Sequence, residues 1–296
     1  MNKRLVPIVV LLAITIYPAL TVRAVSNQGA RLKVTYSSRS YAQVLAHVVH
    51  DGYIDYVRLK SHHMSDLNNY LQLISFVGPK TTPDQFSTNA AKLAYYINAY
   101  NATMIKRWID AGAGDPQVLK THPKVDEKTW FGQYVYCVDG KDVNLGQLEF
   151  EGVFGVSKDI RIHASLICGA QSCPPLHDVP YSSDADTLDA QLETAARNWM
   201  GESDGLFIDR QNRVWMSDVF RYYAKDFASI GGMAGLIERW MDDTDMRKPI
   251  ALAAAKNKHV LYQKWNWTIN QAGLDVDRTV DLTTEHYEPK KKSSTP

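Results

Sequence analysis

A histidine and two cysteines lie close together in the sequence, and these residue types can carry nucleophilic chemistry. His163 precedes Cys168, which is followed by Cys173 and two prolines. A thiol becomes an effective nucleophile when a histidine lowers its pKa and a third polar group orients that histidine. We therefore predict a Cys–His centre in which Cys168 attacks a carbonyl and His163 transfers the proton.

Three polar side chains are candidates for the group that orients His163. Glu149 lies in a predicted helix, and Asn98 and Asn101 lie about one turn apart on a longer one. The amides have an alternative role, because a buried asparagine often ties a helix to neighbouring backbone. We assign Glu149 and Asn98 to the predicted catalytic group. The candidates for ligand binding are Tyr100, Asn101, Arg161 and Cys173.

The cysteines allow other interpretations. Cys168 and Cys173 could form a disulfide that fixes their loop, could bind zinc together with His163 and His177, or could be inert buried thiols. Cys137 lies in an alternating segment and is expected in the core. No phosphate loop, dinucleotide fingerprint or zinc-protease helix occurs, so we predict no cofactor and no metal.

The first 24 residues have the features of a secretory signal peptide. Lys3 and Arg4 precede an apolar stretch from Leu5 to Leu20, and Val22-Arg23-Ala24 offers small residues for cleavage. No later segment is apolar over the ~20 residues that span a bilayer. We therefore predict a secreted or periplasmic protein with no transmembrane segment in the mature chain.

Apolar periodicity predicts one α+β domain over residues 41–272, between a flexible leader at 25–40 and a C-terminal tail at 273–296. Its helical N-terminal part would pack on a small, mostly antiparallel sheet, an arrangement that allows a papain-like or transglutaminase-like architecture. Predicted helices cover Tyr41–Val49, a segment capped by Ser65 and Asp66, Ser87–Asp110, Leu145–Phe154 behind an Asn144/Gln147 capping box, Leu188–Met200, Ser217–Phe227, Met233–Met241 and Lys248–Lys256. Predicted extended segments are Tyr53–Val57, Trp130–Val138, Ile160–Ile167 and a hairpin over Leu206–Met216.

The composition limits the classes of partner. Lys and Arg number 33 against 32 Asp and Glu, a formal charge of +1, so the chain lacks the strongly basic surface typical of nucleic-acid binders. A hydrophobic content of 45% is enough for a sizeable folded core. We expect a small-molecule or peptide ligand and no nucleic acid.

Four segments, in this order, resemble the DUF547 family, a family whose activity is not established. They are Leu93–Ala102, Asn144–Glu149, Arg161–Leu176 and Met216–Phe227. Tyr53–Val57 and Trp265–Asn270 resemble its flanking segments, and the signal peptide indicates an exported, bacterial-type member. The resemblance implies that the family's pattern includes Asn98, Asn101, Glu149, His163, Cys168 and Cys173.

One position departs from that pattern, because the family usually has a histidine after the glutamate and this chain has Phe150. Two functions remain open. The first is a thiol-dependent hydrolase or acyl transferase with a Cys168–His163 centre. The second is a non-catalytic envelope binding or assembly module in which Cys168–Cys173 is a structural disulfide.

Overall fold

Helix α4 (Asn89–Asp110) is buried along most of its length and confirms the prediction for residues 87–110. The computed structural model describes residues 34–115, 127–202 and 205–272, so the predicted signal peptide, most of the leader and the tail lie outside the described residues. The Thr88 hydroxyl accepts a hydrogen bond from the Ala91 amide at 3.0 Å and caps α4. Since α4 is apolar on several faces, other elements pack around it.

The elements before the cysteine loop belong to the same hydrophobic core as α4. Helices α1 (Arg39–Val48) and α3 (Met64–Phe76) pack against each other, and α3 also contacts α4. The remaining elements are short: strands β1 (Val49–His50), β2 (Tyr53–Ile54), β3 (Val135–Val138) and β4 (Lys141–Asn144), helices α2 (Tyr56–Arg58) and α6 (Glu127–Gly132), the π-helix η1 (Leu59–His63) and the 3-10 helix η2 (Pro83–Gln85). β1 pairs with β2 and β3 with β4, both antiparallel.

The predicted capping box at Asn144 is confirmed. Asn144 Oδ1 accepts from the Gln147 amide at 2.8 Å, and Gln147 Oε1 accepts from the Asn144 amide at 3.1 Å. The helix continues as α7 (Leu145–Gln147), the π-helix η3 (Leu148–Val153) and α8 (Phe154–Val156). π turns inside helices are frequent at functional sites, and this one carries Glu149.

The predicted strand over Ile160–Ile167 is wrong. Ile160–Ala164 is a 3-10 helix, η4, whose start is capped by Asp159 Oδ1 accepting from the Arg161 amide at 2.9 Å. The groups that would have joined a strand ladder bond elsewhere, since the Ile167 amide and the Ser165 carbonyl both pair with the Asn101 side chain. The side chain of Asn101, on α4, therefore makes the hydrogen bonds that a neighbouring strand would have made.

Further local predictions need correction, among them the extended segment Tyr53–Val57, in which only Tyr53–Ile54 is a strand and Tyr56 begins α2. Trp130 lies in α6, so the strand begins only at Val135. Cys137 is exposed, because the β3–β4 hairpin turns its outer face to solvent. Helix α3 begins at Met64 after His63, with no capping hydrogen bond from a side chain, so the predicted cap at Ser65 and Asp66 is not formed.

The residues after the cysteine loop build a second hydrophobic core. Its elements are helices α9 (Ala185–Gly201), α10 (Asp218–Tyr222), α11 (Gly232–Trp240) and α12 (Lys248–Lys256), the 3-10 helix η5 (Asp226–Ile230) and strands β5 (Leu206–Ile208), β6 (Val214–Met216) and β7 (Val260–Tyr262). β5 and β6 form the predicted antiparallel hairpin, and β7 adds to β6 in parallel. Ser217 caps α10 as predicted.

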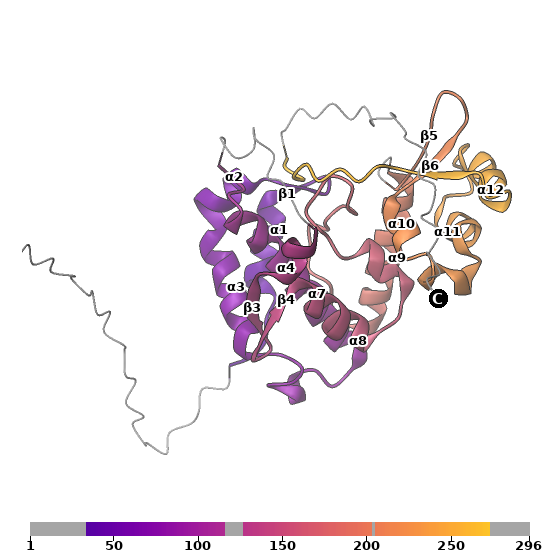
Figure 1. Cartoon of the computed structure of the whole chain (residues 1–296). Coiled ribbons are helices and arrows are strands. Elements are labelled where there is room, and N and C mark those ends of the chain that lie inside the picture. The colour runs from indigo at the N-terminus through magenta and orange to yellow at the C-terminus, as the bar shows by residue number, and fades with distance from the viewer. Residues whose placement is uncertain (1–33, 116–126, 203–204, 273–296) are drawn as a thin grey trace, which may run out of the picture. The chain divides into compact units, whose positions relative to one another are not determined.

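The chain then returns to the first core, as the yellow segment of Figure 1 shows. The Asn270 carbonyl accepts from the Ile54 amide at 3.2 Å, and the Ile54 carbonyl accepts from the Ala272 amide at 3.0 Å. This return brings Trp265 and Trp267 beside the cysteine loop. The α+β class with small, mostly antiparallel sheets is confirmed. Among the residues described, no helix combines the length and the apolar character needed to cross a membrane.

Candidate functional site

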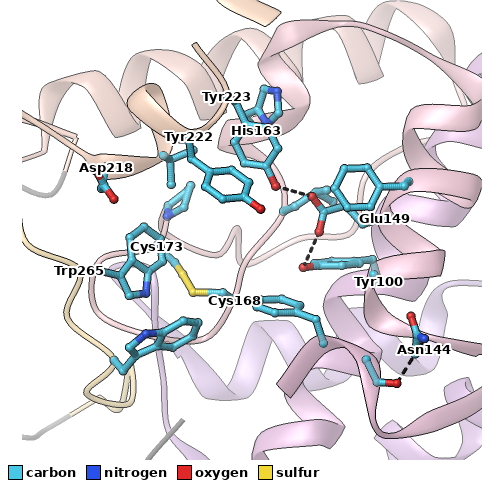
Figure 2. Close-up of a pocket in the computed structure, with 18 residues that line it drawn as sticks. Tyr100, Asn144, Glu149, His163, Cys168, Cys173, Asp218, Tyr222, Tyr223 and Trp265 are labelled. Carbon is cyan, nitrogen blue, oxygen red and sulfur yellow. Dashed lines mark hydrogen bonds between the residues drawn. A yellow bond between two sulfur atoms is a disulfide. The ribbon is translucent and has the colours of Figure 1, made fainter. Parts of the chain in front are cut away.

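A pocket of about 640 Å³ lies where the two cores meet the returning segment. Figure 2 shows the residues that line it, which come from α4, α6, β4, α7, η3, η4, the cysteine loop, α10 and the returning segment. The pocket collects five of the eight predicted site residues: Tyr100, Glu149, His163, Cys168 and Cys173. Because a cavity of roughly 300–1,000 Å³ is typical of small-molecule sites, it is the candidate functional site of this chain.

Glu149 is buried in the pocket wall and accepts hydrogen bonds at both carboxyl oxygens. Tyr223 Oη donates to Oε1 at 2.7 Å and Tyr100 Oη donates to Oε2 at 3.4 Å, as the dashed lines of Figure 2 show. Burial raises the pKa of Glu149 above its ordinary value, although the two hydroxyls act in the opposite direction. Glu149 is therefore held in place by tyrosines and makes no hydrogen bond to His163 within the described structure.

The partner of His163 is Asp226, which our sequence reasoning missed. His163 Nε2 lies 3.0 Å from Asp226 Oδ2, and the imidazole packs against the rings of Tyr223, Phe154 and Phe227. Burial lowers the pKa of His163, and the Asp226 carboxylate opposes that effect. Because a carboxylate can only accept, His163 Nε2 is the donor of this hydrogen bond. Asp226 lies in the fourth segment that resembles the family, Met216–Phe227, and its place in that segment could have identified it as a candidate.

Cys168 and Cys173 are joined by a disulfide in the pocket wall, with their Cα atoms 5.9 Å apart. A disulfide sulfur has no thiolate, so Cys168 is not a nucleophile in this state. Between the cysteines, Gly169 has a φ of +74°, and a Cβ there would collide with Trp108 Nε1. The Cys168 carbonyl accepts from that same nitrogen at 2.8 Å, which fixes the start of the loop against α4.

The returning segment is fastened to the cysteine loop by backbone and side-chain hydrogen bonds. The Asn270 amide donates to the Gly169 carbonyl at 2.9 Å, and the Gln171 amide donates to the Thr268 carbonyl at 2.8 Å. At the far end, the Asn266 amide donates to Ser172 Oγ at 2.7 Å. These bonds set the tryptophans on either side of Asn266, Trp265 and Trp267, in the pocket wall.

Asn98 and Asn101 do not line the pocket. Asn98 pairs with both backbone groups of Tyr181 at 2.8 Å, and Asn101 pairs with the Ser165 carbonyl and the Ile167 amide at 2.9 and 3.0 Å. The nitrogen and the oxygen of each side-chain amide are both bonded to backbone, which ties α4 to another segment. Their geometry matches the alternative role considered for them, and neither contacts His163 through a hydrogen bond that the structure describes.

Arg161 also lies away from the pocket. Its guanidinium bonds Asp159 Oδ2 at 2.6 Å and Asp189 Oδ1 at 2.7 Å, which links η4 to α9. Phe150, at the position where the resemblance expects histidine, lines the pocket with 56% of its surface exposed. Within the ranges described, no group of three His, Cys, Asp or Glu side chains is arranged to hold a metal, and the two thiols of the zinc alternative are bonded to each other.

Residues 83–200, less than half of the chain, match the family model described as "Protein of unknown function, DUF547". The match supports the family that the four motifs indicated. It includes the pocket residues from Tyr100 to Cys173 and ends before Asp226 and the two tryptophans. No curated protein and no solved structure matches this chain.

Proposed function

We propose that this protein is an exported binding module that holds a small ligand in the pocket, and that the Cys168–Cys173 disulfide is structural. One observation carries the proposal: Cys168, the residue expected to be the nucleophile, is bonded to Cys173. The disulfide also supports the proposed export, because such bonds persist in oxidising compartments. The apolar segment Leu5–Leu20 after two basic residues is the second support for export.

The polar groups of the pocket support binding over catalysis. The hydroxyls of Tyr100 and Tyr223 are directed to Glu149, and the His163 imidazole is directed to Asp226. Both tyrosine hydroxyls are bonded to Glu149, and no hydrogen bond in the described structure joins His163 to Glu149 or to a sulfur of the disulfide, so the Asp226–His163 pair is not directed at a second reacting group. Binding would then depend on the shape and the aromatic lining of the pocket.

The binding proposal is tested with a neutral fluorescent probe, N-phenyl-1-naphthylamine, and a variant that fills the pocket. Gly146 lines the pocket, and a Cβ there would meet only Asn144 Oδ1 at 3.4 Å and the Phe131 carbonyl at 3.9 Å. Gly146→Leu should therefore fold and exclude the probe, lowering its fluorescence at least fivefold. The matched control is Gly201→Leu in α9, where a Cβ meets nothing within 4 Å. Equal probe binding by both variants would contradict the proposal.

A second candidate function is thiol chemistry after reduction. It is favoured by one observation, namely that Cys168, His163 and Glu149 all line the same pocket. Reduction would give Cys168 a thiol, and a neutral His163 could accept its proton. If this candidate holds, iodoacetamide should label Cys168 in the folded, reduced protein, and His163→Ala should slow the labelling at least tenfold. An equal rate in both proteins would eliminate it.

A further inference from the structure

We propose that the ligand carries a methylated ammonium group, which the pocket holds among aromatic rings. This inference rests on the proposed binding function and names the chemical class of the ligand. The class follows from three properties of the pocket: the surfaces it offers, the polar groups that are already bonded, and the sign of the charges around it.

The surfaces are mainly aromatic. Seven phenylalanine, tyrosine and tryptophan residues line the pocket: Tyr100, Phe131, Phe150, Tyr222, Tyr223, Trp265 and Trp267. Trp267 contacts both Trp265 and Phe131, with ring centroids 5.7 and 6.4 Å apart. Tyr222 and Tyr223 contact each other at 4.8 Å. The faces of such rings attract cations, and tryptophan does so most strongly.

The polar groups of the lining are mostly bonded within the protein. Asn144 donates to the Gly132 carbonyl and accepts from the Gln147 amide, so both ends of its side chain have partners. The hydroxyls of Tyr100 and Tyr223 are directed to Glu149. A ligand rich in hydroxyl groups would need hydrogen bonds that these side chains already make. A quaternary ammonium group needs none.

The charges favour a cation over an anion. Among the residues described, the pocket lining contains no lysine or arginine, whereas Glu149 and Asp218 are part of it. The charge of Asp218 is offset by its ion pair with Arg221. The Asp226 carboxylate is less offset, because burial lowers the pKa of its partner His163 and so disfavours the cationic imidazole. An anionic ligand would lack a counter-charge in the lining. The lining therefore offers a cation both aromatic rings and carboxyl groups, with Trp265 and Asp218 on one side of the pocket in Figure 2 and Glu149 on the other.

Trp265 offers a direct test of the aromatic contribution. Its indole Nε1 is buried without a hydrogen-bond partner in the described structure, so replacing the ring does not break a hydrogen bond. We therefore expect Trp265→Leu to fold and to keep a melting temperature close to that of the unchanged chain. Trp267→Leu is the second variant should the first be unstable. The matched control is Phe76→Leu, an exposed aromatic residue outside the pocket.

The experiment compares choline with its neutral isostere, 3,3-dimethylbutan-1-ol, by calorimetric titration into the full oxidised chain. We expect choline to bind at least tenfold more tightly than the isostere, and Trp265→Leu to weaken choline binding at least tenfold while Phe76→Leu has no effect. Equal or tighter binding of the isostere would overturn the cationic class and leave the binding function standing. If neither compound binds while the naphthylamine probe does, the cationic class is likewise overturned. Failure of the probe as well would remove the binding function itself.

Discussion

The pocket has two walls that differ in how they are built. The inner wall, consisting of Tyr100, Glu149, His163, Cys168 and Cys173, belongs to the part of the chain that matches the family model. Its side chains are bonded to one another or to neighbouring protein groups and are almost entirely buried. The aromatic wall follows that part of the chain. It consists of Tyr222, Tyr223, Trp265 and Trp267.

The aromatic wall is more open. Tyr222 is 68% exposed, and Trp265 and Trp267 are half-buried. Buried side chains that are hydrogen-bonded within the protein stabilise the fold. Exposed rings have few contacts in the free protein and gain most of theirs when a ligand binds. The difference indicates a division of roles in which the inner wall determines the shape of the pocket and the aromatic wall contacts the ligand. Substitutions in the two walls should therefore affect different measurements.

The largest loss of stability is expected for Asn101→Ala, which removes the support behind the inner wall. The Ser165 carbonyl and the Ile167 amide would both lose their partner, and each buried unsatisfied group costs about 1–3 kcal/mol. We expect the free energy of unfolding in urea to fall by about 2–4 kcal/mol. The control is Asn257→Ala, an exposed residue whose amide donates to the Ala253 carbonyl, with a loss within about 0.5 kcal/mol. Similar losses for both would show that Asn101 does not support this wall.

The 3-10 helix Ile160–Ala164 is an element that the sequence did not predict. The capping box at Asn144, the long helix α4 and the hairpin β5–β6 were all predicted, because each depends on residues close in sequence. Ile160–Ala164 reads as a strand when only its apolar residues are counted. The backbone that follows it, at Ser165 and Ile167, bonds the side chain of Asn101 on α4, and spacing within the segment carries no information about so distant a partner.

In the site, too, residues close together in sequence could be predicted and residues from distant segments could not. Cys168 and His163 line one pocket, and sequence reasoning could select both as candidates because they lie in one short segment. Asp226 reaches His163 through the second core, and the two tryptophans reach the pocket through the returning segment. The redox state of the cysteines was an open alternative, since a spacing of five residues allows both a disulfide and free thiols.

Reduction of the disulfide should have the next largest effect. A closed loop of this length contributes about 2 kcal/mol in the chain-entropy account. In a Cys137→Ser chain, whose only cysteines are the bonded pair, dithiothreitol should lower the melting temperature by about 4–8 °C. A chain in which Cys168 and Cys173 are also replaced by alanine should not respond to the reagent. A melting temperature that reduction leaves unchanged would contradict a structural role for the bond.

Glu149→Gln should change stability in a pH-dependent way. Burial raises the pKa of Glu149 above its ordinary 4.5, so the folded chain bears no penalty below that pH and loses stability as the pH rises through the folded pKa. The glutamine variant avoids that loss, and its stability relative to the unchanged chain should rise between pH 4 and pH 7 by an amount on the order of 1 kcal/mol. Urea unfolding at both pH values measures it. Glu151→Gln, at an exposed carboxylate paired with Lys141, is the control. A difference that stays constant with pH would refute the burial effect.

The smallest effect on stability is expected in the aromatic wall. Tyr222→Ala removes a ring that is 68% exposed, so the free energy of unfolding should stay within about 0.5 kcal/mol of the unchanged value. Binding of the naphthylamine probe should nevertheless weaken several-fold, because the ring lines the pocket. A stability loss as large as that of Asn101→Ala, with unchanged binding, would contradict the division of roles between the two walls.

The central claim is that Cys168 is part of a wall and not a nucleophile, and alkylation of the native protein tests it most directly. The oxidised full chain is treated with iodoacetamide, and the intact mass is measured. Cys137 is exposed and free, whereas Cys168 and Cys173 are bonded to each other. The account predicts one label, at Cys137, and three labels only after reduction and unfolding. Labelling of Cys168 in the native, unreduced protein would contradict it.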